Sequence, residues 1–338
     1  MVHGARPLDA DRGHPRTMQF SIPRPAAVPF PFAGLSTYGT GVLYVLAAGV
    51  ALGTLGPVSN VAYGAGMGSP TFAALRATVG ALVLLAFAGR DERRISLRSL
   101  SRRGQGLLAM TAGAQACLSL ALFAAYGAMS VALVLAVYFS YPLLVCAASI
   151  ALGRERLTPV RAGALLLSLA GLLVVVLGRS GPGVHASAMG LALAAVAACC
   201  QATYLVASRN GFTRVPSTQA VTVILVGAAL AIWAVALPVD GTAGRLLAWV
   251  SDPAAWLAIV FAGVVGAGLA KVWLLRGVRR VGGTRSSVLM LVEPITGVAL
   301  AAVLLGQPFG APELLGGAAI LVGAMLAQRP AAVARAGS

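Results

Sequence analysis

Two short stretches, Tyr138-Phe-Ser-Tyr-Pro142 and Met290-Leu-Val-Glu-Pro294, decide how this chain folds. Each lies near the middle of a long apolar segment, and their prolines are 152 residues apart. The same offset places Gly171 on Gly323. A proline removes one helical hydrogen bond and displaces the carbonyl four residues before it. The pairing therefore predicts a duplicated chain with an interrupted helix at the same place in each half.

The chain around these stretches is apolar enough to lie in lipid. Of its 338 residues, 59% are hydrophobic and 10% charged, whereas a soluble domain carries about 25% charged residues. This composition excludes a soluble single domain and a disordered protein, and it predicts an all-α membrane protein. A helix needs about 20 apolar residues to cross the hydrocarbon core, and ten segments qualify: 39–60, 69–89, 105–125, 128–152, 158–178, 187–208, 217–237, 254–275, 283–306 and 312–328.

The basic residues predict the orientation of these spans. Of 25 basic residues, 21 fall on the side that holds the N-terminus, two fall on the other side, and Arg76 and Lys271 lie inside spans. The positive-inside rule then places both termini in the cytoplasm. The arginines stand in short runs between apolar segments, without the interleaved aromatic residues of a nucleic-acid groove, so no nucleic-acid partner is expected.

The predicted organisation is two five-helix repeats with a short tail at each end. We expect a proline-rich, disordered cytoplasmic tail over 1–37, a first repeat over 38–185, a second over 186–330, and a short cytoplasmic tail over 331–338. Because five is odd, the second repeat crosses the membrane in the opposite sense to the first. Two inverted halves that rock against each other expose a central site to alternate sides, as in many secondary transporters.

Three charged side chains lie inside the predicted spans, where a charge costs about 3 kcal/mol or more on insertion scales. Glu293 lies about ten residues, or roughly 15 Å, into its span. It either carries a proton, balances the charge of a substrate amine, or caps the backbone freed by Pro294. Arg76 either binds a carboxylate, pairs with Glu293, or extends to the outer interface. Lys271 either extends to the cytoplasmic interface or, if it faces inward, forms a second proton or anion site.

Uncharged polar groups form a second set of candidates for the lining of a cavity. Tyr138 and Tyr141 flank Pro142, and Tyr141 occupies the repeat position of Glu293. Gln115 and Tyr204 lie in spans of opposite halves. Each of these side chains either contacts substrate or holds helices together by hydrogen bonds within the lipid.

No motif for a cofactor or for catalysis is present in the sequence. The three His are isolated, and the Cys lie in apolar segments without zinc-ligand spacing. The sequence holds no Ser-His-Asp set, phosphate-binding Gly-Lys-Thr loop or dinucleotide fingerprint. We therefore predict neither cofactor nor metal and no enzymatic activity, and expect a gradient to drive any transport.

Four stretches follow one another in a fixed order: 53–60 (Gly-Thr-Leu-Gly-Pro-Val-Ser-Asn), 72–76 (Phe-Ala-Ala-Leu-Arg), Pro142…Glu155…Gly171, and Glu293-Pro294…Gln307…Gly323. Over about 39–328 the chain resembles the EamA-type ten-span members of the drug/metabolite transporter superfamily. The resemblance implies export of small metabolites, amino acids or drugs across the bacterial inner membrane. Halves of that family commonly end their fourth helix in Gly-Glu, and Gln307 departs from this pattern, so it is given no charged role.

Together these features predict a secondary active transporter that exports a small molecule by alternating access with proton coupling, as a monomer or homodimer. The alternative on the same scaffold is a flippase for a lipid-linked carrier or a phospholipid, which needs a lateral opening. A membrane enzyme or sensor needs a reactive cluster at one interface, and the sequence contains none.

Overall fold

The computed structural model describes residues 36–88, 95–128, 134, 137–153, 158–177, 187–242, 244–305 and 311–328. The regular structure in these ranges is helical throughout. Residues 1–35 and 331–338 of the predicted tails lie outside the described residues, as do Glu155 and Gln307.

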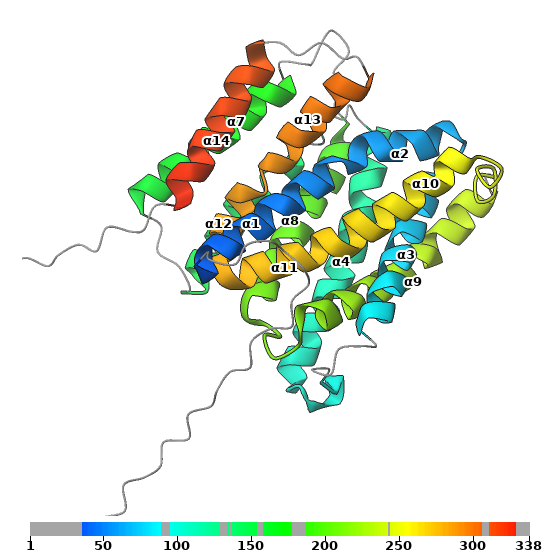
Figure 1. Ribbon diagram of the computed structural model, residues 1–338, viewed down its shortest axis with the longest axis horizontal. Coiled ribbons are helices and arrows are strands. Elements are labelled where there is room, and N and C mark those ends of the chain that lie inside the picture. The colour runs from blue at the N-terminus through cyan, green and yellow to red at the C-terminus, as the bar shows by residue number, and fades with distance from the viewer. Residues whose placement is uncertain are drawn as a thin grey trace, which may run out of the picture. The chain divides into compact units, whose positions relative to one another are not determined.

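The helices of the described residues follow one another in two halves of the chain (Figure 1). The first half contains α1 (Thr37–Gly53), α2 (Leu55–Gly64), α3 (Ser69–Ala88), the short 3-10 helix η1 (Leu97–Ser99), α4 (Arg102–Ala128), α6 (Tyr141–Ala151) and α7 (Pro159–Leu177). The second half contains α8 (Ala188–Asn210), α9 (Ser217–Thr242), α10 (Pro253–Phe261), η2 (Ala262–Leu269), α11 (Ala270–Val281), α12 (Gly283–Leu289), α13 (Val292–Leu305) and α14 (Ala311–Gln328). Since α1–α2, α10–η2–α11 and α12–α13 each form one interrupted span, this is the predicted ten-helix, inverted-repeat fold.

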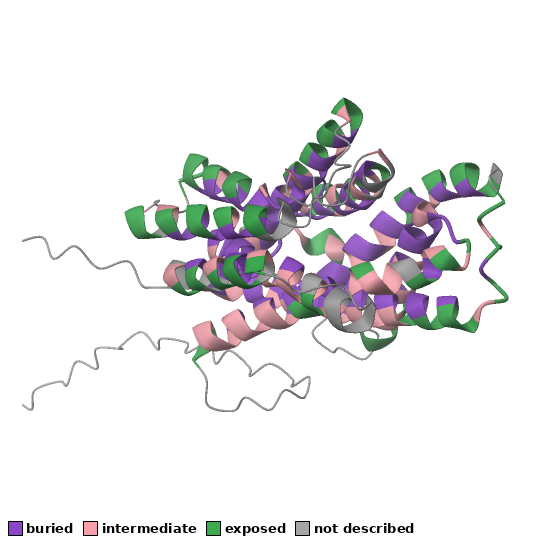
Figure 2. Cartoon of the chain, turned by 90° about the horizontal axis from the view of Figure 1, so that it is seen from above, coloured by how far each residue is buried: buried purple, intermediate pink, exposed green. Residues whose placement is uncertain are grey.

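Length and hydropathy identify the helices that can cross a bilayer. Six stretches within the described residues are long and apolar enough: Thr37–Gly64, Ser69–Phe87, Arg102–Leu122, Ala188–Arg209, Ser217–Gly241 and Pro253–Val281. Large apolar side chains such as Leu166, Leu230 and Leu257 are exposed on outward faces, and Figure 2 shows buried residues on the faces that helices turn to one another. A surface of this kind suits lipid rather than water, and the chain is a multi-pass membrane protein.

The contacts between helices repeat with the two halves exchanged. Helix α1 packs on α11 as α4 packs on α8, and α3 packs on η2 as α9 packs on α4. The pair α7 and α14, side by side in Figure 1, pack on each other. A Cβ added to Gly171 would lie 2.6 Å from the Gly316 carbonyl oxygen, and one added to Gly323 would lie 2.6 Å from that of Ala164. Because 316 and 164 also differ by 152, the two contacts are copies related by the axis between the halves.

The helices are interrupted next to the paired prolines. Helix α6 begins at Tyr141, so Pro142 lies in its first turn. Helix α12 ends at Leu289 and α13 begins at Val292, so Pro294 also lies in a first turn. Proline is tolerated there because the first N–H groups of a helix have no intrahelical partner. The first span is interrupted in the same way, at Thr54, with Pro57 early in α2.

The eighth span contains an irregularity of another kind. Residues 262–269 form the π-helical segment η2, in which Gly263, Gly266 and Gly268 are buried. Single π turns inside α-helices are rare and are frequent at functional sites. No pattern in the sequence predicts this π-helical segment.

A buried carboxylate joins the halves at the end of the bundle where α3 begins. Asp240, in α9, is 2% exposed and accepts hydrogen bonds from the backbone N (2.9 Å) and the Oγ1 (2.6 Å) of Thr71. These bonds satisfy donors in the first turn of α3, which lack intrahelical partners. The contact therefore stabilises the packing of α3 against α9.

We expect Asp240→Ala to lower the free energy of unfolding by about 1–3 kcal/mol, because buried donors lose their acceptor. Asp252 is a matched control, since it caps α10 through Ala254 N (2.8 Å) at a more exposed position. Its replacement by Ala should cost about 0.5–1 kcal/mol. Unfolding in mixed detergent micelles measures both values, and equal losses would argue against a special role for the Asp240 contact.

Arg279 makes a contact within the second half of the chain, at the opposite end of the bundle. From α11 it donates to Val215 O (2.9 Å), Ser217 Oγ (3.0 Å) and Phe212 O (3.0 Å). One guanidinium thus holds the whole turn between α8 and α9.

Candidate functional site

A small pocket lies between α3, α4, α9, η2 and α11. Its polar lining consists of Arg76, Gln115, Ser119 and Lys271. The remaining lining residues are small or apolar: Ala77, Leu225, Ala228, Ile232, Gly266 and Ala267. The pocket therefore combines an apolar wall with a few polar groups, as small-molecule sites do.

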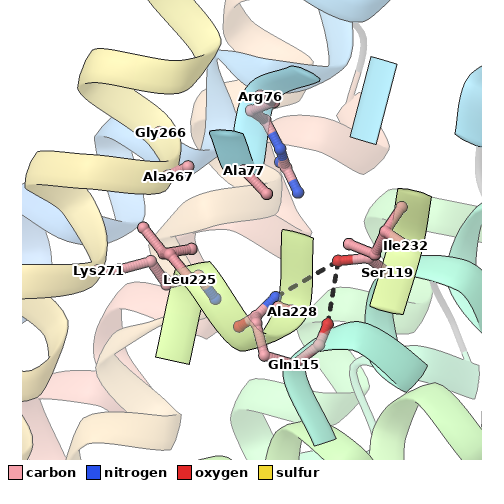
Figure 3. A pocket seen from close by; sticks show the side chains of 10 residues that line it. All are labelled: Arg76, Ala77, Gln115, Ser119, Leu225, Ala228, Ile232, Gly266, Ala267 and Lys271. Atoms are coloured by element: carbon pink, nitrogen blue, oxygen red, sulfur yellow. Dashed lines mark hydrogen bonds between the residues drawn. The ribbon is translucent and has the colours of Figure 1, made fainter. Parts of the chain in front are cut away.

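The polar groups reach the pocket from three helices. Figure 3 shows Arg76 and Lys271 extending from α3 and α11 toward the Gln115–Ser119 pair of α4. Gln115 and Ser119 are one helical turn apart and share a face of α4. Gln115 Nε2 donates to Ser119 Oγ (3.4 Å), which donates to the Gln115 backbone carbonyl (3.1 Å).

Lys271 faces inward rather than toward the membrane interface. It is 8% exposed and lines the pocket. Its Nζ lies 5.0 Å from the centre of the Tyr204 ring, a cation–π contact with α8. Of the two alternatives that the sequence left open for Lys271, the structure has the inward one. Tyr204 is fully buried beneath Lys271 and does not line the pocket.

Glu293 lies beside the pocket, in the first turn of α13. It is half-buried and interacts electrostatically with Lys271 and Arg76. Arg76 thus lies near Glu293 rather than at the outer interface. The three groups form one charge cluster, which we call the Glu293 cluster.

Irregular backbone from three spans meets beside the Glu293 cluster. A Cβ on Gly53, at the end of α1, would lie 2.5 Å from the carbonyl oxygen of Glu293. A Cβ on Gly266, in η2, would lie 2.6 Å from Leu55, at the start of α2. In a membrane, irregular backbone is tolerated where protein or water satisfies it, so this convergence suits a binding site.

Tyr138 and Tyr141 form an aromatic cluster with Phe139 in the first repeat of the chain. Their ring centres are 5.5 Å apart, and that of Phe139 is 5.0 Å from Tyr138. Tyr141 interacts electrostatically with Glu293, so residues at equivalent positions of the two repeats lie near one another. Neither tyrosine lines the pocket.

Ser119 and the segment η2 are parts of the site that the sequence analysis missed. Ser119 follows Gln115 by four residues, so helical spacing places it on the same face. Three buried glycines lie within six residues of η2, and their small size admits the π winding. In the described part of the chain, no three His, Cys, Asp or Glu side chains gather closely enough to hold a metal ion.

Comparison with known protein families accounts for both halves of the chain. A profile of the EamA-like transporter family matches residues 39–177 and again residues 188–328. The chain belongs to the EamA-like transporter family. The two EamA-like repeats cover nearly all of the helices described above. The protein is therefore a membrane transporter of the drug/metabolite superfamily.

Solved structures show the same fold as this EamA-like protein. One, titled "Crystal structure of protein", superposes with a TM-score of 0.70 at 24% sequence identity, over 86% of this chain and 96% of that chain. At that identity the likeness concerns the fold. A search of curated proteins gave no match.

Proposed function

We propose that this EamA-like protein is a secondary active transporter that exports a small metabolite by alternating access. The observation that carries the proposal is the pocket itself, which lies where α3 and α4 of the first repeat meet α9, η2 and α11 of the second. Rocking of inverted halves changes access to a site at such a junction.

The proposed energy source is a proton gradient acting through Glu293. The carboxyl lies beside two cations in an apolar surrounding, where binding a proton changes the charge of the whole cluster. A cycle in which Glu293 binds a proton on one side and releases it on the other couples proton entry to export. Arg76 and Lys271 belong to the same proposed machinery.

We propose that the protein lies in the inner membrane of a bacterial cell. In this topology both termini are in the cytoplasm. It rests on the distribution of arginine between the two sides, and it keeps 38–185 and 186–330 as the two repeats. The lining residues that the structure describes all come from one chain, which supports a monomer as the transporting unit.

Substrate counterflow in proteoliposomes tests the transport function. We expect exchange of labelled solute above the level of protein-free liposomes for at least one class in a panel of carboxylates, amino acids, amines and sugars. Exchange at the protein-free level for the whole panel would refute transport of small solutes.

Two substitutions on α9 make this test specific for the pocket. Ala228 lines it, whereas Leu230, two residues on, is 69% exposed on the outward face. Ala228→Phe should reduce counterflow to the protein-free level by filling the pocket, and Leu230→Phe should leave it unchanged. Size-exclusion chromatography of each variant checks that it is folded. Equal loss of counterflow in the two variants would place the transport path outside this pocket.

A further inference from the structure

We propose that the solute is a small organic anion with a carboxylate and a neighbouring hydroxyl group, and that Lys271, Arg76 and Gln115 select it. This inference rests on the transport function proposed above and names the substrate class of the same pocket. Three features carry it: the net charge of the site, a buried acceptor on Gln115, and the apolar wall of the pocket on α9.

The charge of the site favours an anion. Lys271 and Arg76 both line the pocket and are close enough for electrostatic interaction with each other, which for two cations is repulsion. Glu293 balances one of the two positive charges, and when it carries a proton it balances neither. Uncompensated charge in a membrane interior is costly.

Solutes of different charge change this balance in different ways. A monoanion brings the cluster to neutrality when Glu293 is ionised, and it lowers the excess from two charges to one when Glu293 is protonated. A zwitterion leaves the excess unchanged, and a cation increases it. In the low dielectric of the bilayer these differences decide which solute binds.

The buried amide of Gln115 calls for a hydrogen-bond donor on the solute. Gln115 is 4% exposed, and its Oε1 has no partner among the described residues. The Ser119 hydroxyl proton is used on the backbone carbonyl, so the amide bonds to Ser119 through Nε2 and keeps Oε1 available. A buried acceptor without a donor costs about 1–3 kcal/mol. A hydroxyl beside the carboxylate supplies that donor while the carboxylate meets the two cations.

The remaining lining limits the carbon skeleton. Leu225, Ala228 and Ile232 form an apolar wall on α9, which suits a short aliphatic chain. A hydroxycarboxylate of few carbons matches all three features.

Four probes with the same three-carbon skeleton separate the contributions: lactate, propionate, alanine and 1-amino-2-propanol. Calorimetric titration of the purified protein in detergent measures binding, and counterflow measures transport. We expect lactate to bind about 3- to 10-fold more tightly than propionate, because one neutral hydrogen bond is lost. Alanine and 1-amino-2-propanol should bind at least about tenfold more weakly than lactate.

Substitutions at Lys271 and Gln115 connect the preference to these side chains. Lys271→Met should weaken lactate binding by about 10- to 100-fold, as expected for a lost charged hydrogen bond, and Lys271→Arg should restore most of it. Gln115→Glu is nearly isosteric and adds a negative charge to the pocket. It should abolish lactate binding and bring the affinity for alanine above that for lactate.

Each outcome decides between the two proposals. Lactate binding with counterflow supports both, and lactate binding without counterflow of any solute in the panel supports the site and overturns transport. Counterflow of alanine or the amine in preference to lactate leaves transport standing and overturns the anion. Lactate binding that is unaffected by Lys271→Met and Gln115→Glu, or no binding by any probe, overturns the inference.

Discussion

Glu293→Gln is expected to reduce transport driven by a pH gradient to the level of protein-free liposomes, while counterflow at equal pH continues. Glutamine has nearly the shape of a protonated glutamate, so the variant stays in one of the two charge states of the Glu293 cluster. The group at position 293 is then always neutral, as protonated Glu293 is, for its neighbours Lys271, Arg76 and Tyr141. Exchange needs the loaded pocket to reorient, whereas net coupled transport also needs the proton to leave.

Proton movement reported by a pH-sensitive dye inside proteoliposomes checks this prediction. Asp252→Asn is the matched control, since it removes a carboxylate from the start of α10, away from the pocket. The control should transport at the normal rate with the normal pH dependence. If Glu293→Gln does the same, Glu293 does not carry the coupled proton, and the alternatives of counter-charge or backbone cap remain.

Gly171→Ala and Gly323→Ala are each expected to destabilise the protein by about 1–3 kcal/mol, the usual cost of overpacking a close contact. In each variant the new Cβ meets a backbone carbonyl oxygen at 2.6 Å, and a carbonyl in a helix cannot turn aside. The α7–α14 pair must therefore separate. Because one separation relieves both contacts, the double variant should lose less than the sum of the single losses.

The same two helices provide control glycines. A Cβ on Gly163 of α7 or Gly317 of α14 meets nothing within 4 Å. Alanine there should be neutral or stabilise the protein by about 0.5–1 kcal/mol, because alanine favours the helix over glycine. Thermal unfolding in detergent compares the four variants, and a Gly171→Ala variant as stable as Gly163→Ala would contradict the close packing.

The fold could be predicted from the sequence because its determinants recur in the chain. Apolar length predicts the spans, and the offset of 152 residues predicts the duplication. That offset aligns Gly171 with Gly323. In the structure Gly171 packs against α14, and Gly323 packs against α7. These features depend on local composition and on comparison of the chain with itself, which a single sequence provides.

The site could be predicted less completely, because contacts across helices depend on how each helix is turned. Glu293 and Arg76 follow from their depth in the spans, and the structure places both at one cluster. The inward direction of Lys271 could not be predicted, because its position near the end of the eighth span fits either alternative. The participation of Ser119 depends on which face of α4 meets α9, and the sequence of α4 alone does not specify that face.

The π winding of η2 makes the location of one positive charge depend on backbone length rather than on the side chain. If η2 wound as a regular α-helix, with about 100° per residue instead of the smaller angle of a π turn, α11 would be rotated relative to α10. Lys271 follows η2 by two residues, so its ammonium would then leave the chamber that it now shares with Arg76. In this transporter a change in η2 that restores α winding, with every polar side chain retained, should change selectivity as deeply as replacement of the lysine.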